Sequence, residues 1–308
     1  MRAFRFLIVV LVLVPLPASL AAEPLRFGVP PWQGAEVKTA VVTQALQAAG
    51  FDTTVIEASP GPVFEAMANG ELDANLSAWE PGQEEAFRPL VDTGALTVLG
   101  INLEGAETGL AVPESARRAG LRSMNDLTDY RGELDTTVYC IEPGSGANAV
   151  VAEAREQDLY GLGSWQVVPS STQAMLAQVE RAVSRDGWIV FCAWRPHWMN
   201  VAFDLHYLAD PEGHWGRGSG GARVYTVVRS GLVDEVPGVV RFLRRFSVGA
   251  ATQSRWVHAY ARQERSAEAV AQDWLTANQE RVRAWFQGVD GPSGQPAGER
   301  FAASVAQW

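Results

Sequence analysis

The sequence predicts an α/β protein of two lobes, each a mainly parallel sheet flanked by helices. Two stretches, residues 25–80 and 134–194, support this prediction, because in each of them short apolar, β-branched runs alternate with helical segments. Parallel strands joined by right-handed helical crossovers are the expected outcome of such alternation. Each stretch also ends near a tryptophan followed closely by a proline, so the two halves share one design.

The ends of the elements are read from glycines, caps and breaks in the apolar pattern. In the first stretch we expect strands at 25–29, 53–57 and 72–79, with helices at 36–49, closed by Gly50, and around 63–68. In the second stretch we expect strands at 134–140, 165–168 and 188–192, with helices that begin near 148 and 172.

The C-terminal part returns to a sheet once and is otherwise helical. A strand at 224–228 follows the glycine-rich segment 216–221, and helices are expected at 239–246, 253–261 and 267–285. Within the last helix, Trp274 and Trp285 lie near three turns apart, so they should share one apolar face in the core. Residues 292–298 are expected to form a loose surface segment.

Composition and charge narrow the function classes. The chain has 308 residues, of which 47% are hydrophobic and 19% charged, so extended disorder is excluded. The 25 basic against 35 acidic residues give a net charge of -10, which argues against nucleic acid as a partner. The histidines and cysteines lack the spacing of a metal site, so neither a metal nor a cofactor is expected.

The N-terminus resembles a secretory signal peptide. Arg2 and Arg5 precede an apolar run at 6–14, two prolines break that run, and small residues lead to a cleavage site after Ala21. The apolar run is too short to span a membrane comfortably. We therefore expect residues 1–21 to be removed and the mature protein to be periplasmic.

Two cysteines, Cys140 and Cys192, each end a β-like run. Export permits a disulfide between them. Neighbouring strands often hold side chains in poor disulfide geometry, so two buried thiols are an equally good interpretation. Both alternatives stay open at this point.

Three tryptophans stand out because each follows a strand-like run and has a proline or glycine nearby: Trp32, Trp79 and Trp194. Loops at the carboxyl ends of parallel strands form the ligand crevice of α/β proteins. Several exposed rings gathered there are suited to a cation that donates no hydrogen bonds, such as a quaternary ammonium group. The alternative is that each ring covers the core of its own lobe, but the three together favour an aromatic box.

A glycine-rich loop at 141–148 joins a predicted strand to a predicted helix. Its backbone N–H groups, the side chains of Ser145 and Asn148, and the backbone at Gly146 are candidates for binding the polar end of a ligand. His197, three residues after Trp194, is a further candidate donor. The alternatives are an ordinary capped strand–helix turn and a structural histidine.

At these residues the chain resembles the glycine betaine/choline-binding proteins of ABC importers, a branch of the type II periplasmic binding proteins. The matching pieces cover nearly all of the mature chain in order: Trp32, Ala78-Trp79-Glu80-Pro81, the loop from Ile141 to Asn148, Thr172-Gln173-Ala174-Met175-Leu176, Trp194-Arg195-Pro196-His197-Trp198-Met199, Gly220-Gly221-Ala222, Trp274 and Trp285.

The resemblance implies how the chain is divided and what it binds. One lobe would comprise residues 22–103 and 220–308, and the other 105–218, with hinge crossovers near 104–109 and 210–222. The box would be Trp32, Trp79 and Trp194, and the loop at 145–148 would bind the polar end of the ligand. Thr108 stands where choline-binding relatives have a tyrosine and Gly34 where they have an acid, so the fourth wall of the box is unassigned.

The function implied is capture of glycine betaine or a related methylated amine by a monomer that docks transiently on an ABC permease in the inner membrane. Choline, carnitine and trimethylamine N-oxide are the alternative ligands, and we expect a methylated zwitterion to bind more tightly than choline. A secreted enzyme that acts on a methylated amine is an alternative of another class. The sequence shows no nucleophile, metal cluster or cofactor loop to support it.

Overall fold

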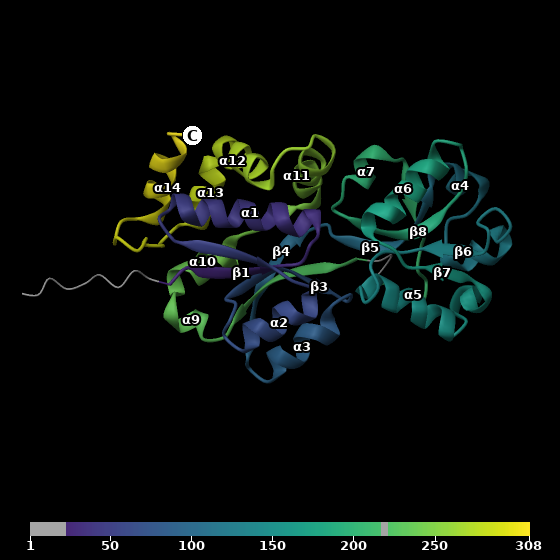
Figure 1. Ribbon diagram of the computed structural model, residues 1–308, viewed down its shortest axis with the longest axis horizontal. Coiled ribbons are helices and arrows are strands. Elements are labelled where there is room, and N and C mark those ends of the chain that lie inside the picture. Colours follow the sequence, from purple (N-terminus) through teal and green to yellow (C-terminus); the bar gives the residue numbers. More distant parts are fainter. Residues whose placement is uncertain (1–22, 217–220) are drawn as a thin grey trace, which may run out of the picture.

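The computed structural model describes residues 23–216 and 221–308 of the chain, so the predicted signal peptide lies outside the described residues. Figure 1 shows two α/β bodies side by side, each built around its own sheet. We call the body around the six-stranded sheet the first lobe and the body around the five-stranded sheet the second lobe.

The first lobe has a mixed sheet. Its strands are β1 (Leu25–Val29), β2 (Thr53–Glu57), β3 (Ala74–Glu80), β4 (Leu96–Glu104), β10 (Arg223–Arg229) and β11 (Val248–Gly249), in the order β11-β4-β10-β3-β1-β2. Strands β2, β1 and β3 run parallel, as predicted, but β10 lies antiparallel between β3 and β4. The returning strand enters from the other lobe and therefore runs against its neighbours.

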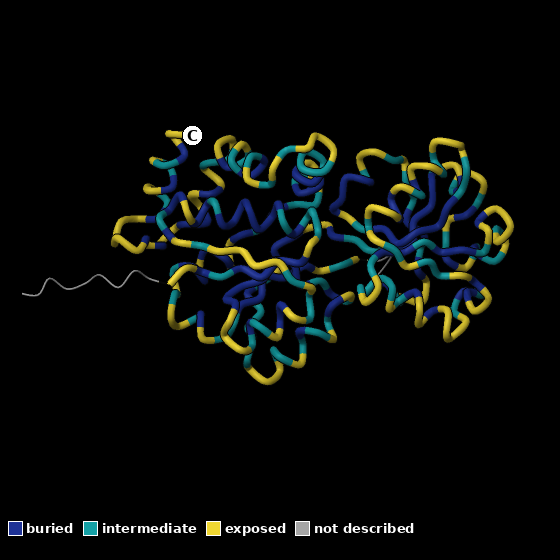
Figure 2. Tube along the Cα trace, viewed as in Figure 1, coloured by how far each residue is buried: buried dark blue, intermediate teal, exposed yellow. Residues whose placement is uncertain are grey.

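Helices cover both faces of the first sheet (Figure 1). They are α1 (Gln33–Ala48), α2 (Pro60–Ala68), α3 (Glu84–Asp92), α9 (Leu232–Glu235), α10 (Pro237–Arg245), α11 (Ala250–Arg262), α12 (Ala267–Ala277), α13 (Gln279–Trp285) and α14 (Ala297–Val305). Helix α1 is buried over most of its length, because it packs between the sheet and helices α11, α12 and α14. Figure 2 shows the contrast with β2, an exposed strand at the edge of the sheet.

Two predictions about the C-terminal part need correction. The expected helix at 267–285 is broken at Asn278 into α12 and α13, yet the rings of Trp274 and Trp285 still stack, with centroids 5.8 Å apart. The segment 292–298 was expected to be loose along its whole length, but its last two residues belong to α14. Ala297, the first residue of that helix, is fully buried. Packing of Phe301 against Phe286 holds α14 on the lobe.

The second lobe also has a mixed sheet. Its strands are β5 (Glu107–Pro113), β6 (Thr137–Tyr139), β7 (Gln166–Val168), β8 (Val190–Arg195) and β9 (Leu205–Tyr207), in the order β7-β6-β8-β5-β9. Its α-helices are α4 (Glu114–Ala119), α5 (Gly146–Glu156), α6 (Thr172–Val183) and α7 (Met199–Ala202), with 3-10 helices at Met124–Tyr130 and Leu159–Ser164. Strand β5 is antiparallel to both β8 and β9.

Two crossovers join the lobes. The chain passes from β4 to β5 through Gly105 and Ala106, and it returns between β9 and β10 through a segment that is only partly described. Helix α11 of the first lobe reaches across, with Val257 buried in the core of the second lobe and the Arg262 guanidinium 4.7 Å from the Trp198 ring centre. Within the described ranges, no helix has the length and apolar character needed to cross a membrane.

A disulfide joins Cys140 and Cys192 inside the second lobe. Cys140 directly follows β6 and Cys192 lies in β8, which pairs with β6 in parallel. Their Cα atoms are 4.8 Å apart and both side chains are fully buried. The bridge therefore links the two strands whose following segments reach the region between the lobes.

Candidate functional site

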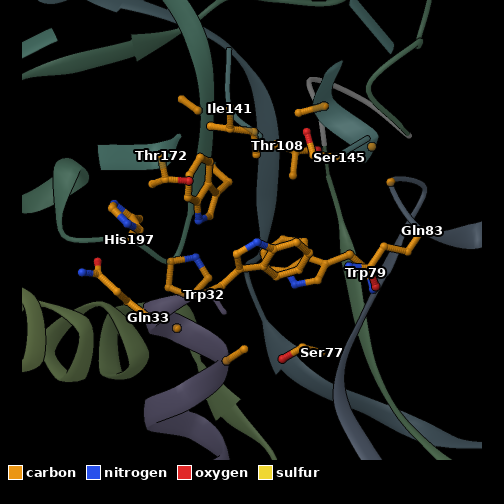
Figure 3. Close-up of a pocket in the computed structure, with 18 of the residues that line it drawn as sticks. Trp32, Gln33, Ser77, Trp79, Gln83, Thr108, Ile141, Ser145, Thr172 and His197 are labelled. Carbon is orange, nitrogen blue, oxygen red and sulfur yellow. The ribbon is translucent and has the colours of Figure 1, made fainter. Parts of the chain in front are cut away.

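A cavity of about 120 Å³ lies between the two lobes (Figure 3). In the first lobe its walls come from the N-terminal end of α1, the end of β3 and Gln253 of α11. In the second lobe they come from the segment after β6, the start of α6, Thr108 of β5, and the end of β8 with the segment that follows it. Both lobes are therefore needed to enclose whatever occupies it.

Trp32, Trp79 and Trp194 all line this cavity and are half-buried. Trp32 precedes α1 as its N-cap residue. Trp79, predicted at the end of its strand, is the penultimate residue of β3. Trp194 was predicted in the loop after its strand, but it is the penultimate residue of β8. The strands extend past their apolar runs because pairing continues there, Trp79 opposite Val224 and Trp194 opposite Thr108. Strand pairing thus holds two of the three rings on rigid elements from different lobes.

His197 lines the cavity as a neutral donor. Its side chain is buried, and this burial lowers the pKa of the imidazole to about 3. Nδ1 accepts a hydrogen bond from the Met199 N–H at 3.3 Å, so the proton of the neutral ring is on Nε2. The ring stands edge-on to Trp194, with centroids 4.8 Å apart. His197 therefore offers both an aromatic edge and an uncharged N–H.

The loop after β6 presents hydrogen-bond donors. The Ser145 oxygen accepts from the Asn148 N–H at 3.4 Å and from Asn148 Nδ2 at 3.0 Å, which leaves its own proton free to donate. The N–H groups of Gly146 and Ala147, at the start of α5, have no acceptor among the described residues. Ser145, Gly146 and Ala147 line the cavity, where a helix N-terminus favours negative charge.

Asn148 does not line the cavity, contrary to the prediction. Its Nδ2 donates to the carbonyl oxygens of Ile141 and Glu142, each at 2.6 Å, as well as to Ser145. These bonds turn the side chain back into the loop. Asn148 thus positions the loop from behind.

The predicted single polar end divides into two. Figure 3 shows Ser145 and Gln83 on one side of Trp32 and Trp79, and His197 and Gln33 on the other. The reason is topological: α5 and α7, which follow the two segments, cover opposite faces of the second sheet (Figure 1). We call the Ser145 side, with Gln83, Gly146 and Ala147, the donor pole. We call the His197 side, with Gln33, Gly34 and Gln253, the mixed pole.

Among the described residues, the cavity lining carries no uncompensated charge. Glu80 is the one charged residue of that described lining, and Arg88 and Arg223 both bind its carboxylate. Thr108 lines the cavity beside Ser145 (Figure 3) and adds no fourth tryptophan or tyrosine ring. In the described residues, no group of three or more acidic, histidine or cysteine side chains is arranged to hold a metal ion.

Four glutamines line the cavity. Gln33, Gln83 and Gln253 were missed in the sequence, and Gln173 lies in the segment 172–176 that carries the family resemblance. Gln83 Oε1 accepts from the Trp79 N–H at 3.1 Å, while its Nε2 has no acceptor in the described part of the chain. Neutral amides follow no periodic pattern, and Gln253 is brought to the cavity from a helix far along the chain. No signal in the sequence singles them out.

The two lobes touch at the mouth of the cavity through glycine backbone. A Cβ atom on Gly146 would lie 2.5 Å from the Cα of Gly82 and closer still to its carbonyl oxygen. By contrast, a Cβ on Gly82 would lie 3.8 Å from the Cα of Gly146, an ordinary contact. Gly146 therefore permits the close approach of the lobes.

This architecture is similar to that of known proteins. The chain matches the substrate-binding domain of ABC-type glycine betaine transport systems over residues 23–277. It is 28% identical to a glycine betaine/carnitine transport binding protein of Listeria monocytogenes over 204 residues, which span 66% of this chain and 63% of that protein.

Two solved structures share the fold and 30% of the sequence. One is an ABC-transporter choline-binding protein in complex with choline, with a TM-score of 0.85 over 92% of this chain and 98% of that one. The other is lactococcal OpuAC in its closed form with glycine betaine, with a TM-score of 0.76 over 86% of this chain and 99% of that one. The two mixed sheets match those of type II periplasmic binding proteins. The chain belongs to the family of substrate-binding domains of ABC-type glycine betaine transport systems.

Proposed function

We propose that this chain captures glycine betaine, or a closely related methylated zwitterion, and delivers it to an ABC permease in the inner membrane. One observation carries the proposal: three tryptophans from both lobes line a cavity that has donors but no unpaired carboxylate. The signal-peptide pattern of residues 1–21 supports a periplasmic location, and we propose that the protein acts as a monomer.

The trimethylammonium group would lie against the faces of Trp32, Trp79 and Trp194. A quaternary nitrogen donates no hydrogen bonds, so ring faces are its natural partners. Each desolvated ring–cation contact contributes about 2 kcal/mol. Because the rings come from both lobes, the bound cation would stabilise the closed arrangement over an open one.

The carboxylate would lie at the donor pole. Gln83 Nε2, the Ser145 hydroxyl and the N–H groups of Gly146 and Ala147 all donate, and the N-terminus of α5 adds its dipole. Hydrogen bonds to a carboxylate are roughly twice as strong as those to a neutral hydroxyl. A zwitterion also matches the described part of the lining, where the one carboxylate, Glu80, is bound by arginines.

Choline is the second candidate ligand, because the choline-bound relative superposes with a TM-score of 0.85. The positive charge of choline needs an acidic partner, and neither Glu80 nor Glu36 is available. Glu80 is bound by two arginines, and Glu36 lies outside the lining and accepts from the Tyr260 hydroxyl at 2.5 Å. We therefore expect betaine to bind more tightly than choline.

Competitive titration calorimetry with betaine, choline and 3,3-dimethylbutanoate tests this ranking. The last compound keeps the carboxylate and loses the cation. We expect betaine to bind best and the dimethylbutanoate worst. Tighter binding of choline would contradict the carboxylate assignment, and equal binding of the dimethylbutanoate would contradict the aromatic box.

Closure of the lobes gives a second test. Gly146→Ala places a methyl group against the backbone of Gly82, so the closed state is disfavoured and betaine affinity should fall more than about tenfold. Gly82→Ala is the matched control and should change affinity less than about twofold, since its methyl group fits. Calorimetry on both variants decides the matter, and equal effects would show that the glycine contact does not control binding.

We propose no enzymatic activity. Glu80 and Glu142 are the two carboxylates that could be proposed as a catalytic acid–base pair, but both already accept hydrogen bonds. Glu80 is bound by two arginines, and Glu142 accepts from the N–H and the hydroxyl of Thr172 at 2.8 and 3.0 Å. Prolonged incubation with betaine, choline and carnitine, followed by proton NMR, should return each compound unchanged. Conversion of any of them would favour the enzyme alternative.

A further inference from the structure

Asn200 lies in α7, directly after the segment that brings Trp194 and His197 to the cavity. Its side chain is half-buried and does not line the cavity. Nδ2 donates to the carbonyl oxygen of Trp194 at 2.8 Å and to that of His197 at 3.2 Å. One amide group therefore holds the backbone of the two residues whose rings stand edge to edge at the cavity, with centroids 4.8 Å apart.

The oxygen of the same amide is bound as well. Oδ1 accepts from the Tyr207 hydroxyl at 2.9 Å and from Arg195 Nε at 3.3 Å. A carbonyl oxygen only accepts and a guanidinium only donates, so these bonds fix which end of the Asn200 amide faces which partner. Both protons and both acceptor sites of the amide are then used, which leaves the side chain a single orientation.

The partners of Asn200 belong to the sheet of the second lobe. Tyr207 is the last residue of β9, its ring is buried, and the Arg195 guanidinium lies 4.6 Å from the ring centre. Arg195 Nη1 also pairs with a Glu107 carboxylate oxygen of β5 at 3.0 Å. Because successive residues of a strand point to opposite faces, Arg195 points away from the ring of Trp194. Asn200 is thus anchored to three strands through side chains that do not line the cavity.

We infer that Asn200 is a positioning residue for the aromatic box: its amide fixes the backbone of Trp194 and His197, so that the Trp194 ring, with His197 against it, faces the methylammonium group of the ligand. The inference rests on the proposed function, because it concerns the ring that the second lobe places on that group. Ring–cation attraction requires the cation to lie over the ring face, so a rotated ring loses much of it. The alternative is that Asn200 only stabilises the short helix α7.

Asn200→Asp tests the inference, because aspartate keeps the size of the side chain and its acceptors but removes both donated bonds. Betaine should bind about tenfold more weakly, and the loss should stay below the roughly thirtyfold expected for removal of the Trp194 ring itself. The added negative charge would by itself favour a cation, so it cannot account for a loss. Unchanged affinity in this variant would overturn the inference.

The same substitution in Trp194→Ala distinguishes positioning from a purely structural role. If Asn200 acts through the Trp194 ring, Asn200→Asp should change betaine affinity less than about twofold once that ring is gone, because residues that act through one another are not additive. A second full tenfold loss would show that the two positions act independently, which contradicts the inference. Titration calorimetry on the wild type, both single variants and the double variant completes the cycle.

Tyr207→Phe is a neutral second variant, since it removes only the hydroxyl that donates to Asn200. Betaine affinity should fall about threefold in the wild type and not at all in Trp194→Ala. Tyr130→Phe is the matched control: its hydroxyl donates to the carbonyl oxygen of Ala119 at 2.9 Å, in the same lobe but not at the cavity. Equal losses in the two phenylalanine variants would contradict the inference. Thermal unfolding shows whether each variant is folded.

The wild type and Trp194→Ala separate this inference from the proposed function. If Trp194→Ala weakens betaine binding but Asn200→Asp binds as the wild type does, the receptor function stands and the inference fails. If the wild type binds neither betaine nor choline, the proposed function itself is wrong, and the inference fails with it.

Discussion

Replacing Trp194 with alanine is expected to weaken betaine binding about thirtyfold, and replacing Trp79 as well about a thousandfold. Each ring–cation contact contributes about 2 kcal/mol when water is excluded, and the two rings approach from strands of different lobes. Trp194 is the box ring of the second lobe, so its loss alone removes the ring contact that couples binding to closure. Titration calorimetry of the two single variants and the double variant measures each loss.

The fold should survive these substitutions, because neither ring is a core residue of its lobe; both are half-buried at the cavity. Trp188→Ala is the matched control in the second lobe: that ring packs on Tyr130, with centroids 5.6 Å apart, and does not line the cavity. It should leave affinity unchanged even if it lowers the thermal midpoint. Unchanged affinity in both Trp79→Ala and Trp194→Ala would remove the aromatic box from consideration.

Replacing both cysteines with alanine is expected to lower the free energy of unfolding by about 4 kcal/mol. The bridge joins positions 52 residues apart, and it stabilises the fold mainly by reducing the freedom of the unfolded chain. Urea unfolding of the oxidised protein and of the double variant, followed by tryptophan fluorescence, gives the difference.

Thiol titration of the denatured, unreduced protein provides the control for that experiment. The protein isolated from the periplasm should show no reactive thiol, because both cysteines are engaged in the bridge. Two reactive thiols per chain would show that the bridge does not form in the cell. In that case the double alanine variant should lose far less stability.

Local patterns in the sequence were sufficient for most of the elements. Short apolar and β-branched runs located β1, β2 and β10 to within one residue, because β-branched side chains favour strands locally, even in β2, which is exposed. The same patterns did not indicate β4 and β5, the strands on either side of the first crossover. These strands do not belong to a strand–helix alternation, since the chain runs directly from one sheet into the other.

The sequence by itself determined that tryptophans would line the cavity, because Trp32, Trp79 and Trp194 each lie at or just after the carboxyl end of a strand, where the ligand crevice of an α/β protein forms. Only the tertiary structure decided which polar groups line the cavity and where they lie. It moved Asn148 behind its loop, placed Ser145 and His197 at opposite poles, and brought Gln253 against Gly34. The physical reason is that apolar burial leaves a periodic trace along the chain, whereas the partner of a hydrogen-bonding side chain is chosen by which faces and lobes pack together.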